Sequence, residues 1–412
     1  MSDILQEIRD LQFSDKSGAE ALLLSFIRDN FPLDVVSLEL TPLAVSLNSF
    51  NGFMTLADGK RRFFKTHTET DTVIDEYYNA EMLAQAGYPV IQPIFKSTEP
   101  GKQLLVYEVI EDESVFDLAW RIETEDESDL EALTQAQNSA DDDLLSFYRS
   151  TLFEQSADDA AKSPVHQLFY HRLTGGRLDR FYGENTVIQF PDGTHSMADI
   201  RKKKWVINGQ VYDESLDKMI LRAICLLKPA QADVAIIGHG DAHNGNVFFR
   251  KNDTPPSLLY FDPAFAGKHH PLLDLTKPLF HNVFAMWMYF SEAKRDSTSI
   301  SLKKYNDLWI VDYDYQLPDV RQMFLRSKVE RVLIPILQDL KQKNLLRKNW
   351  RAYLKASLMC CPLLTMNLAD NEKFSPEISL LGLAMAVEMG SKSKEKRSLI
   401  DSTLDEVEKA IK

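Results

Sequence analysis

The stretch IIGHGDAHNGNVFF, residues 236–249, places a polar segment rich in His, Gly, Asp and Asn directly after an apolar run. A second apolar run, in LLYFDPAFAGKHHPLLDL at residues 258–275, ends on an aspartate. Short apolar runs that stop at Gly and Asp are typical of buried strands followed by loops. We therefore expect Asp241, Asn246 and Asp262 to lie in loops that follow strands.

These three side chains suit phosphoryl transfer. Asn246 and Asp262 offer the hard oxygen atoms that Mg²⁺ prefers. A carboxylate that does not bind the metal, here Asp241, can accept a hydrogen bond from an attacking hydroxyl. The same chemistry needs a lysine on the phosphates, a helix glutamate that holds this lysine, and a loop over the phosphates, so the chain should supply these as well.

Candidates for the lysine and the glutamate lie upstream in the expected order. Lys65 ends the strand-like run RRFFK. Glu76 lies in the next helical segment, on the face that this segment shares with apolar residues, which turns the carboxylate inward. Glu81 on the same segment is the alternative partner for the lysine.

The phosphate loop and the hinge also have candidates. The segment SLNSFNGF, residues 46–53, joins two expected strands, and backbone N–H groups and hydroxyls in such a loop can bind phosphate. We assign this role to Ser46, Asn48, Ser49, Asn51 and Gly52. The strand LLVYEVI would form the hinge, with backbone groups of Glu108 and Ile110 facing adenine.

The pattern of short apolar runs predicts an α+β protein with two lobes. Residues 1–35 are expected to be an N-terminal helical extension. Residues 36–111 should form a small, nucleotide-binding lobe of antiparallel strands with one helix inserted at about 72–86. Residues 112–412 should form a large lobe that is mainly helical, including most of 274–412.

Two parts of the large lobe have their own character. Residues 123–143 are acidic and polar, and we interpret them as a solvated or mobile segment. Residues 186–212 contain Asp-Gly and Asn-Gly turns, which predict a strand pair. Both lie within or beside a long insertion, at about 121–215, between the hinge and the polar segment quoted first.

Taken together, these motifs resemble the aminoglycoside phosphotransferase and choline kinase group of the protein-kinase-like superfamily. HGDAHNGN matches the His-Gly-Asp-x-x-x-x-Asn loop of that group, and FDPAFAGKHHPLLDL matches its metal-binding Asp and a second Asp twelve residues later. The resemblance is strong over residues 230–280 and weak over 40–110. Asn244 and Pro263 depart from residues common in the group, but neither position supplies a required functional group. No motif in the insertion identifies the substrate.

The resemblance implies a two-lobed kinase-like fold and a role for each site residue. Asp241, in the catalytic loop 239–246, would be the catalytic base. Asn246 and Asp262 would be the Mg²⁺ ligands. Lys65 would contact the α- and β-phosphates of ATP, and Glu76 would pair with it.

The metal segment 262–274 ends on Asp274, which would brace the catalytic segment. Four histidines near the motifs, His239, His243, His269 and His270, raise the alternative of a zinc site, but they lack the ligand spacing of known zinc sites. We expect His239 to pack at the base of the loop and His243 to line the substrate cleft.

Two further segments leave alternatives open. RKKK at residues 201–204 is either a site for an anionic substrate or, more typically between strands, a solvated edge. Residues 166–184 are rich in aromatic side chains and arginine. They form either a surface that recognises sugar or phosphate or a helix core with a turn, and the sequence favours neither.

The composition limits the classes of partner that we expect for this protein. The formal net charge of −14 over 412 residues argues against nonspecific nucleic-acid binding and mildly favours a cationic ligand. Three cysteines without a spaced framework indicate reduced thiols, and we expect a cytoplasmic protein. No run reaches the roughly 18 apolar residues that span a bilayer, so no membrane partner is expected. The oligomeric state stays open.

These observations predict an ATP- and Mg²⁺-dependent phosphotransferase that moves the γ-phosphate to a hydroxyl of a small molecule, such as an amino alcohol, a sugar or an aminoglycoside-like compound. Gly240 stands where protein kinases carry an arginine that reads activation-loop phosphorylation. Only eleven residues separate Asp262 from Asp274, which is too few for a peptide-binding activation segment. The alternatives are a nucleotide-binding pseudokinase and a protein kinase.

Overall fold

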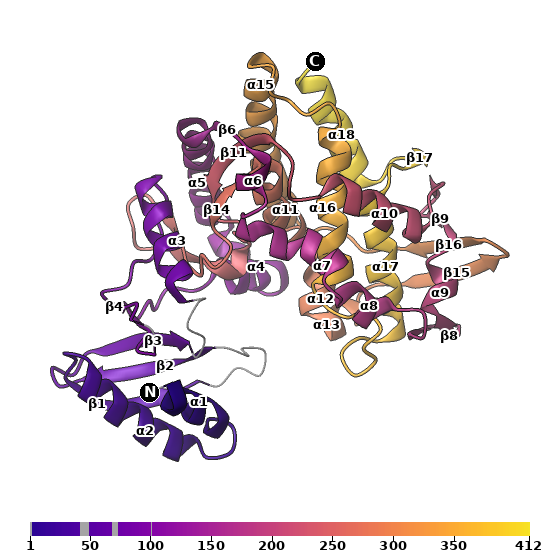
Figure 1. The fold of residues 1–412 in the computed structure, drawn as a ribbon. Coiled ribbons are helices and arrows are strands. Elements are labelled where there is room, and N and C mark those ends of the chain that lie inside the picture. Colours follow the sequence, from indigo (N-terminus) through magenta and orange to yellow (C-terminus); the bar gives the residue numbers. More distant parts are fainter. Residues whose placement is uncertain (1, 42–48, 68–72, 100) are drawn as a thin grey trace. The chain divides into compact units, whose positions relative to one another are not determined.

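The chain folds into two compact units (Figure 1). A computed structural model describes residues 2–41, 49–67, 73–99 and 101–412. Unit 1 comprises Met1–Asp112 and Leu259–Ala264, and unit 2 comprises Glu113–Leu258 and Phe265–Lys412.

Unit 1 is a five-stranded antiparallel sheet with three helices. In chain order its elements are α1 (Ser2–Leu11), α2 (Lys16–Asn30), β1 (Val35–Leu40), β2 (Ser49–Leu56), β3 (Arg61–His67), α3 (Val73–Gln85), β4 (Phe95–Ser97) and β5 (Leu104–Glu108). The strand order is β1-β2-β3-β5-β4. The small antiparallel sheet with one helix inserted after its third strand is therefore confirmed.

Helices α1 and α2 form one hydrophobic core with this sheet. Ile8 of α1 and Ile27 of α2 are fully buried in the same cluster as Met54 of β2 and Phe64 of β3. The apolar residues of α2 recur at helical spacing, so one side of the helix can be buried while the other stays in solvent. Both helices therefore help to stabilise the sheet that carries Lys65.

Unit 2 is mainly helical. Its helices are α4 (Val115–Thr124), η1 (Glu127–Asp129), α5 (Leu130–Thr151), α6 (Ala157–Ala160), η2 (Pro164–Leu168), α7 (Tyr170–Thr174), α8 (Arg177–Tyr182), α9 (Met197–Ile200), α10 (Leu216–Leu226), η3 (Asn244–Asn246), α11 (Pro271–His281), α12 (Met286–Tyr289), α13 (Ser291–Asp296), α14 (Asp319–Lys328), η4 (Val329–Leu333), α15 (Ile334–Gln342), α16 (Trp350–Leu364), α17 (Pro376–Gly390) and α18 (Leu399–Ala410). Helices α16 and α17 pack against each other, and α11 packs against α16. The mainly helical C-terminal part is thus confirmed.

The remaining described strands form four sheets, and β13 continues from unit 2 into unit 1. The strands are β6 (Phe153–Gln155), β7 (Val187–Phe190), β8 (Gly193–Ser196), β9 (Lys204–Ile207), β10 (Gln210–Tyr212), β11 (Asp233–Gly238), β12 (Val247–Arg250), β13 (Ser257–Tyr260), β14 (Gly267–His269), β15 (Ile300–Tyr305), β16 (Leu308–Tyr313) and β17 (Lys394–Glu395). The sheets have the orders β15-β16-β9-β10-β17, β14-β11-β6, β12-β13 and β7-β8. The strand pair expected over 186–212 is two hairpins, β7–β8 and β9–β10.

The interpretation of residues 123–143 as a solvated or mobile segment is wrong. They form the end of α4, the short helix η1 and the first part of α5. Glu123 pairs with Arg321 of α14 at 2.7 Å, and Asp141 is buried and pairs with Lys328. Glu123 and Asp141 pair with cations almost two hundred residues away, which local composition does not reveal, whereas Glu125, Asp126 and Asp143 are exposed.

No helix among the described residues has the length and apolar character needed to cross a membrane.

Candidate active site

The polar segment lies at the end of the central strand of a three-stranded sheet. In β11, Ile236 is the antiparallel partner of His269, and Gly238 is the partner of Gly267. The chain then passes through residues 239–243, makes the short helix η3 and continues into β12. The apolar run is buried as expected, and the polar residues follow where the strand ends.

Asp274, in the first turn of α11, forms three hydrogen bonds, one of which reaches this segment. Its Oδ1 accepts from the backbone N–H of Gly240 at 2.6 Å and lies 2.9 Å from Nε2 of His269. Its Oδ2 accepts from the hydroxyl of Tyr148, on α5, at 2.5 Å. Burial alone would raise the pKa of Asp274, but His269, Tyr148 and the Gly240 amide hold it below its usual range. An ionised, fully bonded carboxylate therefore joins the segment to two helices and a strand.

Two glycines make this contact possible. A Cβ on Gly238 would lie 2.6 Å from Oδ1 of Asp274. Gly240 has a φ of +78°, and a Cβ there would lie 2.3 Å from the backbone oxygen of Phe265. Position 240 therefore has no room for any side chain, which explains why glycine stands there.

Asp241 is a largely buried carboxylate beside a cation. Its side chain is 14% exposed, and its Oδ1 lies 3.6 Å from Nζ of Lys277 and 4.0 Å from Nε2 of His243. Burial acts to raise the pKa of Asp241, but the charges of Lys277 and His243 outweigh it, so the pKa lies below its ordinary value. The carboxylate is consequently ionised at neutral pH.

Lys277 and His281, on α11, were not found from the sequence. Nζ of Lys277 lies 3.3 Å from Nε2 of His281, whose Nδ1 lies 2.7 Å from the hydroxyl of Tyr289. Burial and the neighbouring Lys277 hold the pKa of His281 far below its usual range, so this ring is neutral and accepts at Nε2. The signal was in the sequence: Asp274, Lys277 and His281 recur at helical spacing.

The expected metal ligand of unit 2 is oriented by its own loop. Nδ2 of Asn246 donates to the backbone oxygen of Asp241 at 2.9 Å. No hydrogen bond occupies its Oδ1 among the residues that the structure describes. The backbone N–H of Asn244 donates to Oδ1 of Asn282, which holds the next turn. Asn246 thus presents one amide oxygen, the donor type that Mg²⁺ takes.

The other expected metal ligand belongs to unit 1. Asp262 follows β13 and has a φ of +52°, an uncommon conformation for a residue other than glycine. Its Oδ1 lies 3.4 Å from Nζ of Lys65, at the C-terminal half of β3. The segment 259–264 is tied to this unit by hydrogen bonds from Ile91 to Tyr260 and from Asn79 to Pro263.

The expectation that Ser49, Asn51 and Gly52 lie in a connecting loop is wrong. All three are in β2, where Asn51 is the partner of Lys65, and Gly52 pairs with strands on both sides. A Cβ on Gly52 would lie 2.1 Å from the backbone oxygen of Glu39, so this glycine allows β1 and β2 to approach. Ser46 and Asn48 lie outside the described residues.

The remaining expected nucleotide contacts are in unit 1. Glu76 lies in α3, and its side chain is outside the described part of the chain. The alternative, Glu81, accepts a hydrogen bond from Gln85 on its own helix. Glu108 ends β5, and Ile110 follows it just before the boundary of the unit.

The histidines have separate surroundings. His239 is fully buried at the end of β11, and Nδ1 of His243 accepts from the backbone N–H of Gly245. His269 contacts Asp274, and His270 caps α11 by accepting from the N–H of Leu272. The part of the chain that the structure describes contains no group of three or more His, Cys, Asp or Glu that could hold a metal ion.

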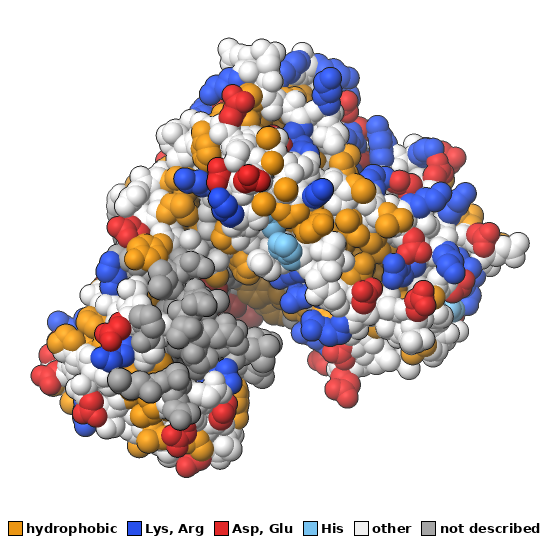
Figure 2. Space-filling model, in the orientation of Figure 1, with side chains coloured by type: hydrophobic (Ala, Val, Ile, Leu, Met, Phe, Trp, Pro, Cys, Tyr) orange, Lys and Arg blue, Asp and Glu red, His pale blue; other side chains and the backbone are white. Residues whose placement is uncertain are grey.

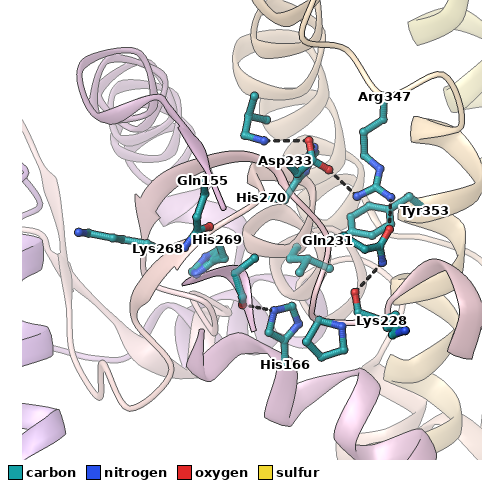
Figure 3. Close-up of a pocket in the computed structure, with 14 residues that line it drawn as sticks. Gln155, His166, Lys228, Gln231, Asp233, Lys268, His269, His270, Arg347 and Tyr353 are labelled. Atoms are coloured by element: carbon teal, nitrogen blue, oxygen red, sulfur yellow. Dashed lines mark hydrogen bonds and ion pairs between the residues drawn. The ribbon is translucent and has the colours of Figure 1, made fainter. Parts of the chain in front are cut away.

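A small cavity lies beside the start of β11 and the end of β14, where Asp233 and His269 are among its lining residues (Figure 3). Its volume is about 20 Å³, enough for roughly one water molecule. Several polar groups around it are paired: Arg347 binds Asp233 at 2.5 Å and stacks on Tyr353, and His166 bonds to the backbone of Ala160. Because the cavity has room for only about one water molecule, we assign it a structural role.

Comparison with known proteins gives structural matches. No protein-family model matches the chain, and no curated protein matches its sequence. An amicoumacin kinase solved with AMP-PNP and Ca²⁺ is 15% identical, with a TM-score of 0.48 and 92% of this chain and 94% of that chain covered. A spectinomycin phosphotransferase solved with ADP and spectinomycin is 14% identical, with a TM-score of 0.42 and coverage of 89% and 98%.

A microcompartment-associated aminopropanol kinase is 11% identical, with a TM-score of 0.39 and coverage of 89% and 94%. The ligands named for these structures belong to those proteins. The chain itself is an α+β protein, with an N-terminal five-stranded antiparallel sheet followed by a mainly helical part, and the structures to which it is similar include kinases and phosphotransferases of small molecules.

Proposed function

We propose that this protein is an ATP- and Mg²⁺-dependent phosphotransferase that moves the γ-phosphate to a hydroxyl of a small molecule. The observation that carries the proposal is the Oδ1 atom of Asp241. It is buried, it belongs to an ionised carboxylate, and it has no hydrogen-bond partner among the described residues. A buried acceptor without a partner is unusual in a folded protein, and an acceptor hydroxyl would satisfy it.

The residues of the site divide the work as follows. Asp241 would accept the proton of the acceptor hydroxyl as it attacks the γ-phosphate, and Lys277 would keep this carboxylate ionised. The hydrogen bond from Asn246 to the backbone of Asp241 would hold the base in place. Lys65 would contact the α- and β-phosphates.

The donors present fit magnesium. Asn246 has one amide oxygen that no described residue occupies, and the carboxylate of Asp262 is 46% exposed and so can be reached from solvent. Both are hard oxygen ligands, and we propose that they hold Mg²⁺, which when bound neutralises charge on the phosphates. The ion pair between Lys65 and Asp262 would then rearrange, since both groups would turn to the nucleotide.

Gly240 supports a small molecule rather than a protein as the substrate. In protein kinases an arginine at this position reads the phosphorylated activation loop. Here a Cβ would already collide with the backbone of Phe265, so no side chain can take that role. The eleven residues between Asp262 and Asp274 also leave no room for a long activation segment.

The direct test is transfer of labelled γ-phosphate from Mg²⁺-ATP into a pool of small hydroxylated metabolites. We expect the wild type to label a metabolite, and Asp241→Asn to lower kcat by about 10²- to 10⁴-fold because the general base is lost. AMP-PNP affinity should stay unchanged, since this carboxylate faces the acceptor. Asp143→Asn, an exposed aspartate on α5, is the matched control.

Each other outcome has a meaning. Labelled protein instead of metabolite would favour a protein kinase. Nucleotide binding without any transfer would favour the pseudokinase. Near-normal turnover by Asp241→Asn would show that another group is the base.

The metal ligand has its own prediction. Asp262→Ala should weaken binding of Mg²⁺-AMP-PNP, because a carboxylate ligand is lost, whereas binding of AMP-PNP without Mg²⁺ should change little. Calorimetric titration with and without Mg²⁺ measures both. Equal weakening in the two titrations would contradict a role for Asp262 as a metal ligand.

A further inference from the structure

We propose that the small molecule phosphorylated by this protein carries an anionic group, a carboxylate or a phosphate, and that Arg172, Arg177 and Lys277 bind this group beside Asp241. The proposal rests on the proposed function and names its substrate class. It also gives a role to residues 166–184, which the sequence left between a recognition surface and a helix core.

The three cations come from three helices of unit 2. Lys277, on α11, lies 3.6 Å from Asp241. Arg172 of α7 and Arg177 of α8 both donate to the backbone oxygen of Leu364, at the end of α16, over 3.5 Å and 3.2 Å. Helix α16 packs against α7, α8 and α11, and Figure 1 shows α7 and α16 side by side. The end of one helix therefore gathers the two guanidinium groups.

The charge of Arg172 also acts on the proposed base. Burial raises the pKa of Asp241, and the charge of Arg172 lowers it, after the larger effects of Lys277 and His243. Burial lowers the pKa of His281, which contacts Lys277, and the charge of Arg172 lowers it further. Burial raises the pKa of Cys361, near the end of α16, and the charges of Lys277, Arg172 and Asp241 also act on this pKa. Both arginines are half-buried, so a ligand in solvent can reach them.

These two arginines lack the partner that comparable arginines of unit 2 have. Each of the following binds a carboxylate: Arg201, Arg222, Arg321, Arg347 and Arg351. Within the described ranges, no carboxylate forms an ion pair with Arg172 or Arg177. Burial, followed by the charges of Arg172 and Arg180, lowers the pKa of Arg177.

Capping of α16 is the structural alternative, because cations stabilise the C-terminal end of a helix. Capping explains the hydrogen bonds to one carbonyl oxygen, that of Leu364, whereas each guanidinium group has five N–H donors. It also does not account for Lys277, which is almost fully buried against the catalytic carboxylate. An anionic group on the acceptor would use the remaining donors of both arginines and would place its hydroxyl near Asp241.

The net charge of the chain does not oppose this assignment. The value of −14 favours a cationic ligand only as an average over the whole surface. Basic and acidic side chains are interspersed on the face drawn in Figure 2, so no single sign dominates it. A bound ligand responds to charges within about 10 Å, the screening distance at moderate salt, and Lys277 lies 3.6 Å from Asp241.

The experiment is calorimetric titration of the full chain, saturated with Mg²⁺-AMP-PNP, with four compounds of similar size: glucose, gluconate, glucose 6-phosphate and glucosamine. We expect gluconate or glucose 6-phosphate to bind at least about tenfold more tightly than glucose, and glucosamine to bind most weakly. The stronger of the two anions tells whether the site prefers carboxylate or phosphate.

Variants test the assigned residues. Arg172→Gln and Arg177→Gln should each weaken binding of the anion by about 10- to 100-fold, and should leave the affinities for AMP-PNP and glucose unchanged. Arg180→Gln removes an equal charge from an exposed position on α8 and should change anion binding less than about threefold. Thermal unfolding checks the end of α16, and Arg172→Lys, which keeps the charge, should retain part of the affinity.

Three results would overturn the proposal: tighter binding of glucose or glucosamine than of both anions, no binding of either anion at about 10 mM, or variants that weaken AMP-PNP instead, which would place the arginines on the nucleotide phosphates. The proposed function fails separately, if AMP-PNP does not bind at all. The anion series without nucleotide would then still test whether these cations form a site.

Discussion

Lys277 is the side chain that sets the charge of the proposed base. Burial raises the pKa of Asp241 and the charge of Lys277 lowers it, so the carboxylate stays ionised to lower pH than it otherwise would. With Lys277→Met only the burial effect and weaker cations remain, and we expect the acid limb of the pH profile of kcat/KM to move to higher pH. Lys277→Arg should restore most of the shift. An unmoved acid limb would show that Lys277 does not control this group.

Gly240 is a second position at which one added atom, a Cβ, should change stability and turnover. Gly240→Ala combines a φ of +78° with a Cβ 2.3 Å from the oxygen of Phe265. We expect it to lower the free energy of unfolding by about 1–3 kcal/mol and to reduce turnover, as measured by urea unfolding and by phosphate transfer. Gly209→Ala is the matched control, since its φ is also +78° but its nearest contact is 3.6 Å away. Equal losses in both variants would assign the effect to φ alone.

At the scale of elements, Asp274 joins α5, β14 and α11 to the segment of residues 239–246. Asp274→Ala leaves the Gly240 amide, His269 and Tyr148 without their acceptor in a buried place, and we expect a loss of about 3–5 kcal/mol in unfolding free energy. Tyr148→Phe removes one donor and should cost only about 0.5–1.5 kcal/mol. Urea denaturation compares the two. Similar small losses would mean that Asp274 does not hold these elements together.

At the scale of the whole molecule, buried histidines make stability depend on pH. Burial lowers the pKa of His166 to about 4 and that of His270 to about 3, while the unfolded chain takes up these protons near pH 6.5. Between these values the unfolded state binds more protons, so the free energy of unfolding falls as the pH is lowered from 6.5 towards 3–4. The contribution of these two histidines to the free energy of unfolding is fully present above pH 6.5.

The prediction is tested with His270→Asn, which can still cap α11 because asparagine is a good N-cap. Denaturant unfolding at several pH values should show a slope between pH 4 and 6 that is smaller by about one proton than in the wild type. An identical slope in the variant would show that His270 does not titrate differently in the two states.

The sequence by itself determined the order and type of the main elements. Runs such as RRFFK and AIIG alternate or cluster apolar residues over a few positions, and this local pattern is enough to predict β3 and β11 and the loops that follow. The α+β class, the small antiparallel sheet and the positions of Asp241, Asn246 and Asp262 after strands all follow from such neighbours in the chain.

Only the tertiary structure decided which residues meet. The sequence suggested that Asp141 is solvated, but in the structure it pairs with Lys328. The sequence also suggested that Gly52 lies in a loop, but in the structure it lies in a strand with a partner strand on each side. The cations around Asp241 come from α7 and α11, about seventy residues before and thirty-six after the base. The physical reason is that charge and burial act through space over several ångströms, whereas a sequence pattern records only neighbours along the chain.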